Sequence, residues 1–179
     1  MGLFPNYTPL PTVWRGWHFR SRLEGRWAIA LSAIGIEFQY EPEGFSVDGE
    51  PYLPDFYLPQ VRMFAEVKPI CFNEREKRLI LKLSDATNCA VLMLVGPPDF
   101  KTYNAIHPVR LKDGETERFE TDYLLDIDWH GRKHFDDGRL FGCTGWECNV
   151  TAPEGSFSPE YRAAVFASRT HRFEEGGKF

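Results

Sequence analysis

Three charged residues in the first half of the chain have the types and the spacing that phosphodiester hydrolysis requires. Asp55 follows Pro54, and Glu66 stands two positions before Lys68. Side chains two apart on a strand point to the same face, so Glu66 and Lys68 share a face if this segment is a strand. If residues 52–58 form the neighbouring strand, Asp55 approaches Glu66. Two carboxylates at one place repel each other, and the pKa of one rises unless a cation lies between them.

A hard divalent cation such as Mg²⁺ suits two carboxylates, because it prefers oxygen ligands and keeps several waters. A bound metal lowers the pKa of its water and holds the scissile phosphate. Lys68, beside such a metal, can hold or deprotonate the attacking water. The residues therefore predict a hydrolytic site for phosphodiesters.

The elements that must position these residues are predicted from hydrophobic periodicity. An apolar stripe over residues 23–34 predicts a helix that Gly35 ends as a C-cap glycine. Segment 36–59 predicts short strands broken by proline and glycine, with a hairpin turn at Asp48-Gly49.

Three further elements follow. Residues 62–70 predict a strand. Residues 73–87 predict a helix, because Asn73-x-x-Glu76 fits a capping box. The continuous apolar run 90–95 predicts a buried parallel strand. The order helix, three strands, helix, strand predicts a mixed sheet covered by helices, which is the α/β (α+β) class.

The chain of 179 residues suits one globular domain with additions. We expect an irregular N-terminal arm over residues 1–16, a core over 17–98, and a less regular extension over 99–179 that packs on this core. Within the extension, residues 159–172 predict a helix with Ser158 as its N-cap.

The PD pair at 54–55 and the EVK run at 66–68 resemble the motif of the PD-(D/E)XK nuclease superfamily, which has the restriction-endonuclease-like fold. The wider run FRSRLEGRWA…GIEFQYEPEGF…YLPDFYLP…AEVKP is similar to small nucleases of phages and other mobile elements. This group is related in style to the endonuclease subunit of heteromeric transposases and to Holliday junction resolvases. The similarity spans roughly residues 17–96.

The resemblance implies a metal-dependent deoxyribonuclease with an αβββαβ core, a mixed sheet flanked by helices. It implies that Asp55 and Glu66 bind Mg²⁺ or Mn²⁺ and that Lys68 orients the attacking water. In many members a glutamate on the preceding helix joins the metal site, and Glu24 holds that position here. The implied partner is DNA, in a bacterial cell or in a host cell infected by phage.

Each of these residues also has a purely structural interpretation. Glu24 can close a capping box with Ser21 and so serve only its own helix. Glu66 and Lys68 can form a solvated ion pair, and Asp55 can belong to a turn. The alternative function is a nucleic-acid-binding or interaction module of the same fold, or a nuclease subunit active only in a larger complex. An idle relative is expected to lack a motif residue, and none is missing.

Arginines gather beside aromatic residues around the first predicted helix. Guanidinium groups suit bidentate phosphate contacts, and aromatic rings can stack on unpaired bases. We expect Arg20 and Arg22 to contact DNA phosphates, with Trp14 and Trp17 close by in the sequence. The alternative is an ordinary solvated charged face.

Composition limits the partners and the compartment. The formal net charge of −5 excludes a globally basic surface for nucleic acid. No apolar stretch has the roughly 20 residues of a membrane-spanning helix, so we expect no membrane partner. Four cysteines are too few for a disulfide-stapled scaffold, and we expect a cytoplasmic protein. A protein partner or a second copy of the chain would dock on the extension.

One group of residues in the extension is compatible with zinc. It consists of an H-x3-H and a C-x4-C couplet, His130, His134, Cys143 and Cys148. Four such ligands can form a tetrahedral site. Their order and spacing are not those of a familiar zinc finger, and the alternative is that Cys148 is simply buried.

Overall fold

The computed structural model describes residues 9–47, 49–101, 103–112, 115–117, 120–127, 133–137 and 157–173. Of residues 110–137 in these ranges only the backbone is described. The helices are α1 (Arg22–Ala33), α2 (Glu74–Thr87) and α3 (Pro159–Thr170). The strands are β1 (Thr12–Trp14), β2 (Trp17–Phe19), β3 (Gln39–Tyr40), β4 (Phe45–Val47), β5 (Glu50–Tyr52), β6 (Phe56–Leu58), β7 (Met63–Lys68), β8 (Ala90–Val95), β9 (Tyr103–Ile106), β10 (Arg110–Lys112), β11 (Glu115–Glu117), β12 (Glu120–Ile127) and β13 (Lys133–Asp137).

A seven-stranded mixed sheet forms the centre of the molecule, in the order β13-β12-β9-β8-β7-β6-β3. β7 and β8 run parallel, and the other neighbours run antiparallel. Helix α2 joins the parallel pair, as a crossover between parallel strands requires. The fold is therefore of the mixed α/β class that the order of elements predicted.

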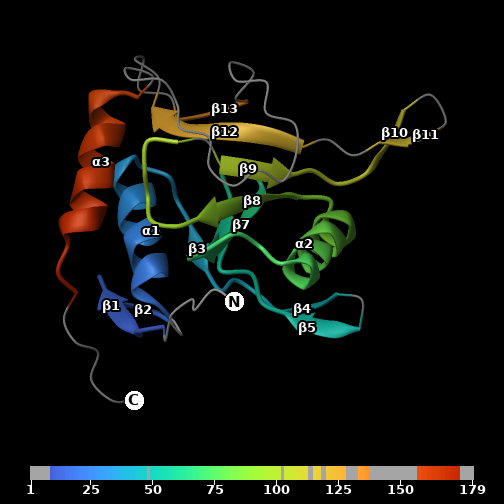
Figure 1. The fold of residues 1–179 in the computed structure, drawn as a ribbon, viewed down its shortest axis with the longest axis horizontal. Coiled ribbons are helices and arrows are strands. Elements are labelled where there is room, and N and C mark those ends of the chain that lie inside the picture. Colours follow the sequence, from blue (N-terminus) through green and yellow to red (C-terminus); the bar gives the residue numbers. More distant parts are fainter. Residues whose placement is uncertain are drawn as a thin grey trace, which may run out of the picture.

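Helices cover both faces of this sheet (Figure 1). α1 and α3 pack on one face, where Ala65 and Val67 of β7 join their core cluster. α2 packs on the other face, where Phe64 of β7 joins a second cluster. Alternate residues of β7 thus enter two cores, and Glu66 lies on the α2 side of a strand that is buried on both faces.

Helix α1 begins and ends as its sequence predicts. The Ser21 side chain accepts a hydrogen bond from the Glu24 backbone N–H. At the other end Gly35 takes the left-handed conformation, with φ of 69°. Within the helix, a Cβ atom on Gly25 would lie 2.9 Å from Thr12 Cγ2 and 3.0 Å from the Phe173 ring, so a glycine allows both segments to approach.

Helix α2 and the hairpin β4–β5 also agree with the prediction. Asn73 and Glu76 form a complete capping box. Glu50 on the hairpin accepts ion pairs from Arg75 and Arg78 on α2. The hairpin turns at Gly49, with φ of 78°. These contacts fix the chain that leads from the hairpin into Asp55.

The C-terminal half extends the same sheet. β9 pairs with β8, and β12 and β13 follow outward. The predicted terminal helix is confirmed as α3, with Ser158 as N-cap and Pro159 in its first turn. Arg26 of α1 donates to the carbonyl oxygens of Ser168 and Arg169, at 2.5 and 2.6 Å. Because these are carbonyls of the last turn of α3, Arg26 fastens that helix end to α1.

The N-terminal arm differs from the expectation of irregular chain. Thr12–Trp14 pair with Trp17–Phe19 as an antiparallel hairpin. Arg15 and Gly16 form its two-residue turn, with φ of 48° and 82°. Two positive φ values match the right-handed twist of the strands, which is why such a turn closes a tight hairpin. The hairpin lies against α1 (Figure 1).

Within the described residues, no helix combines the length and the apolar character needed to cross a bilayer. The expected compartment stays a prediction.

Candidate active site

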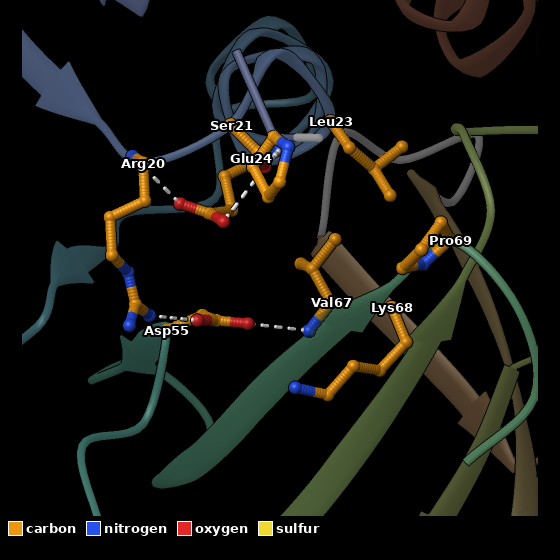
Figure 2. A pocket seen from close by; sticks show the side chains of 9 residues that line it. Arg20, Ser21, Leu23, Glu24, Asp55, Val67, Lys68 and Pro69 are labelled. Carbon is orange, nitrogen blue, oxygen red and sulfur yellow. Dashed lines mark hydrogen bonds and ion pairs between the residues drawn. The ribbon is translucent and has the colours of Figure 1, made fainter. Parts of the chain in front are cut away.

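A cavity of about 260 Å³ opens where the N-terminal end of α1 meets the C-terminal end of β7 (Figure 2). Three of the four predicted site residues line it, namely Glu24, Asp55 and Lys68. The other lining residues are Pro9, Arg20, Ser21, Leu23, Val67 and Pro69. Glu66 lies behind this wall and contacts Asp55, as described below. The tertiary structure thus brings together residues from α1, the β5–β6 connection and β7.

Asp55 stands directly before β6 and is 4% exposed. Its Oδ2 accepts a hydrogen bond of 2.8 Å from the Val67 backbone N–H, and its Oδ1 accepts one of 2.6 Å from Arg20 Nη2. In Figure 2 this carboxylate lies between the Arg20 guanidinium and the Val67 backbone N–H. The Asp55 side chain therefore extends the hydrogen bonding between β6 and β7. A residue that only forms a turn would not need these contacts.

Glu66 is 3% exposed and lies against the same residue. Its Oε1 accepts a hydrogen bond of 3.2 Å from the Asp55 backbone N–H. Its Oε2 lies 3.8 Å from Lys68 Nζ. The expected common face of Glu66 and Lys68 is confirmed. Their ion pair is half-buried instead of solvated, because β7 is covered on both faces.

Burial raises the pKa of both carboxyl groups. The pKa of Asp55 rises to about 6 through burial and the charge of Glu24. The pKa of Glu66 rises to about 8 through burial and the charge of Asp55. The charge of Lys68 lowers both pKa values without cancelling these effects. Two carboxyl groups with raised pKa values and a shared lysine indicate a place where a positive charge would be bound favourably.

Glu24 is 7% exposed and does not form the reciprocal half of a capping box. Its Oε1 accepts from Ser21 Oγ at 2.7 Å. Its Oε2 accepts from Tyr40 Oη at 2.6 Å and from the Arg20 backbone N–H at 3.1 Å. Ser21 still caps the helix, but the Glu24 carboxylate has turned into the cavity. The capping interpretation therefore accounts for Ser21 but not for the contacts of the Glu24 side chain.

Arg20 is placed among acidic side chains. Besides Asp55 it pairs with Glu41 through Nε at 2.6 Å, and about half of its side chain is exposed. Glu41 holds φ of 46°, an uncommon value for a glutamate, and its backbone N–H bonds to the Asp55 carbonyl. Arg20 thus has access to solvent and to the cavity together. Arg22 is half-buried and does not line the cavity.

Three residues of the site were not predicted from the sequence. Tyr40 binds Glu24, and burial together with this bond raises its pKa. Burial and the charge of Glu66 raise the pKa of Tyr52, whose hydroxyl hydrogen-bonds to Glu66. Glu76 lies 3.5 Å from Lys68 Nζ while it caps α2. No local pattern identifies these contacts, because each joins segments far apart in the chain.

The side chains at this site match the ligands of a hard divalent cation only in part. Asp55 and Glu66 offer buried carboxylate oxygens, the type of ligand that Mg²⁺ and Mn²⁺ prefer, and a cation that keeps several waters needs few protein ligands. Among the residues that the structure describes, no three His, Cys, Asp or Glu side chains converge on one metal position. The guanidinium of Arg20 and the ammonium of Lys68 meet the two carboxylates instead. Glu24 would have to leave Tyr40 to become a ligand.

The side chains of the four predicted zinc ligands lie outside the described part of the structure. His130, Cys143 and Cys148 fall outside the described residues, and His134 is described only as part of the backbone of β13. The zinc site stays a prediction.

No protein-family model, no curated protein and no solved structure matches the chain. The functional assignment therefore depends on the geometry and on the motif.

Proposed function

We propose that the protein is a metal-dependent endonuclease that hydrolyses phosphodiester bonds of DNA. The observation that supports this most directly is the pair of buried carboxylates Asp55 and Glu66, with pKa values of about 6 and 8, beside Lys68 at a cavity. A purely structural ion pair would not need two acidic groups in one poorly solvated place.

Asp55 and Glu66 are the residues that would hold Mg²⁺ or Mn²⁺. The bound metal would supply a water of lowered pKa and neutralise charge on the phosphate. Lys68 is half-buried, and its ammonium lies near Glu66 and Glu76 at 3.8 and 3.5 Å. From there it orients a water or donates to a phosphate oxygen without leaving its carboxylate partners. Its position on a covered strand gives it the fixed geometry that catalysis by orientation needs.

Arg20 is the residue that would contact the scissile phosphate. Its guanidinium has the fork geometry that binds phosphate oxygens in pairs. It lies at the mouth of the cavity and bonds to Asp55 and Glu41. A cation held by Asp55 would compete with Arg20 for that carboxylate, and the Arg20 guanidinium would then be available to the phosphate.

The second candidate is a nuclease subunit that acts only inside a larger complex. The bond of 2.6 Å between Arg20 Nη2 and Asp55 Oδ1 favours it, because this pair occupies a carboxylate oxygen that a metal would use. A partner that draws Arg20 away would then activate the site. An inactive binding module of the same fold stays as the third possibility.

The test is a panel of labelled linear, nicked, forked and four-way DNAs and one RNA, incubated with Mg²⁺, Mn²⁺ or EDTA. We expect cleavage of DNA with metal, no cleavage in EDTA, and a loss of at least about 100-fold in Glu66→Gln and in Lys68→Ala. Glu74→Gln and Lys82→Ala are matched controls, because both residues are exposed on α2 and lie outside the cavity.

Folding of each variant is checked by circular dichroism. Cleavage that survives in both Glu66→Gln and Lys68→Ala would remove these residues from the site. Binding of DNA without cleavage under any metal would favour the inactive module or the subunit.

A further inference from the structure

A second hollow is lined by a set of residues that shares no member with the lining of the candidate active site. It is a groove of about 380 Å³ between the tip of the β1–β2 hairpin and the chain that follows α1. Its walls are Trp14, Arg15, Trp17, Ser32, Gly35, Ile36, Glu37 and Phe38. Three aromatic rings and one guanidinium thus meet at a single groove, which the catalytic proposal does not use.

The rings are positioned for stacking. Trp17 is 43% exposed, although it is a large apolar side chain. Its ring centroid lies 5.8 Å from that of Phe38, with the planes tilted by 49°. Phe38 is held from behind by the buried Phe56, at 5.3 Å and edge-on. One wall of the groove is therefore packed against the core, while Trp17 on the other wall is accessible to solvent.

The hairpin turn places a positive charge at the edge of the groove. The Arg15 guanidinium lies 4.7 Å from the ring centroid of Trp14, a cation–π contact. Arg15 itself is exposed, so its donors remain accessible from solvent. On the opposite wall Glu37 is exposed, and its carboxylate would repel a phosphate there. The charges therefore orient an anionic chain with its phosphate towards Arg15.

Two short segments of the chain connect residues that line the groove to residues at the candidate active site. Trp17 begins β2, and Arg20 is the first residue after this strand. The two are three positions apart, which is a path of about 10 Å at strand spacing. Phe38 precedes Tyr40 by two residues. The backbone N–H of Arg20 and the hydroxyl of Tyr40 both bond to Glu24 in the cavity. A nucleic-acid strand whose phosphate lies in the cavity can therefore reach the groove within a few nucleotides.

We propose that this groove binds an unpaired nucleobase of the DNA strand beside the phosphate to be cut, so that the substrate is forked, flapped or frayed DNA and not a closed duplex. The inference rests on the proposed function for the position of the cut. An indole face stacks on any base, because every base has a π-face, while a base paired inside a duplex is not free to enter the groove. Arg15 binds the flanking phosphate.

The test measures binding separately from cleavage. Fluorescence anisotropy of labelled single-stranded, forked and blunt duplex DNA is followed with the full chain in EDTA, at one fixed salt concentration. We expect wild-type protein to bind forked and single-stranded DNA at least about tenfold more tightly than blunt duplex. Trp17→Ala should weaken binding of these two DNAs about tenfold or more and leave blunt duplex nearly unchanged.

Two further variants sharpen the result. Trp17→Phe keeps an aromatic face and should restore most of the binding. Phe166→Ala is the matched control, because Phe166 is a 70% exposed aromatic residue on α3 that does not line the groove. Trp17 is the residue to change because Phe38 also packs against Phe56 and its removal would disturb the core.

The outcomes separate this inference from the proposed function. Equal binding of forked DNA by Trp17→Ala and wild type overturns the groove proposal, even if DNA is cut with metal. Binding of forked DNA that depends on Trp17, without cleavage under any metal, supports the groove and contradicts the nuclease. Absence of binding to every DNA overturns the inference, and the groove then serves a ligand of another class.

Discussion

Helices α1 and α2 begin with the same sequence signal, a capping residue followed three positions later by glutamate, yet the two glutamates behave differently. Glu76 bonds back to the Asn73 backbone N–H and completes a capping box. Glu24 instead bonds to Ser21 Oγ, Tyr40 and the Arg20 backbone N–H. The first arrangement is local, and the second joins the start of a helix to a strand.

Burial explains the difference. The Glu76 side chain is 27% exposed, and the oxygen that the capping bond leaves open is reached by water and by Lys68 Nζ, at 3.5 Å. Glu24 is 7% exposed, so its carboxylate must obtain its hydrogen bonds from the protein. Tyr40, which β3 carries to the same place, supplies one of them. The comparison teaches that a capping motif identifies the start of a helix, while the tertiary environment decides what its glutamate does.

The strongest way to break this comparison is to remove each carboxylate. Glu24→Ala should lower the free energy of unfolding by about 2–4 kcal/mol, because Tyr40 and the Arg20 N–H lose a buried charged acceptor. Glu76→Ala should lower it by only about 1 kcal/mol, the usual value for a lost cap. Urea unfolding of both variants in EDTA measures the difference, and equal losses would contradict a special role of Glu24.

The pH dependence of stability sharpens the comparison further. In the metal-free protein the carboxyl groups of Asp55 and Glu66 hold their protons to about pH 6 and 8, against ordinary pKa values of 3.8 and 4.5. Between about pH 4 and 8 the folded state therefore binds more protons than the unfolded state, so stability is greatest at the low end and falls as pH rises. We expect these two groups to make the folded protein less stable at pH 8 than at pH 5.

Urea midpoints at pH 5 and pH 8 in EDTA measure this loss. Glu66→Gln should remove most of it, because glutamine does not titrate. Glu24→Gln should reduce the part that arises from Asp55, since the charge of Glu24 helps to raise that pKa. Glu76→Gln should leave the part due to Asp55 unchanged. A wild-type stability that rises over this pH range would show that the carboxyl groups are ionised in the folded protein.

The smallest expected effects come from the amide variants compared with each other. Glu24→Gln should cost about 1 kcal/mol, because the amide oxygen can replace Oε2 and the amide nitrogen can donate to Ser21 Oγ, but the charge is lost. Glu76→Gln should change stability by less than about 0.5 kcal/mol, since glutamine also closes a capping box.

Cleavage assays on Glu24→Gln then separate a role of Glu24 in the reaction from its role in folding. If Glu24 acts on a bound metal, Glu24→Gln reduces cleavage strongly and changes the metal dependence, because an amide is a poorer ligand for a hard cation. Glu74→Gln serves as the control, with nearly normal cleavage, because Glu74 is exposed on α2 and lies outside the cavity. Full activity in Glu24→Gln would assign Glu24 to the support of α1 and Tyr40 alone.

Periodicity and local chemistry were sufficient for the main elements. The stripes that predicted α1 and α2, the apolar run of β8 and the Ser158-Pro159 start of α3 describe interactions within a few residues, and such interactions act wherever the segment lies. The turn at Arg15-Gly16 was missed because a hairpin is expected from Asn-Gly or Asp-Gly more than from Arg-Gly. The bond from Arg26 to the end of α3 was not predicted, because it joins residues that are 142 positions apart in the chain.

For the candidate site, the sequence alone determined only which residues of one strand share a face. Alternation on β7 placed Glu66 and Lys68 on one face, because side chains of a strand alternate regardless of what surrounds them. The tertiary structure alone decided that Glu66 is buried, that Glu24 turns from its own helix towards Tyr40, and that Arg20 rather than solvent meets Asp55. Burial depends on every element that packs on the sheet, and burial is what raises the pKa of Asp55 and Glu66.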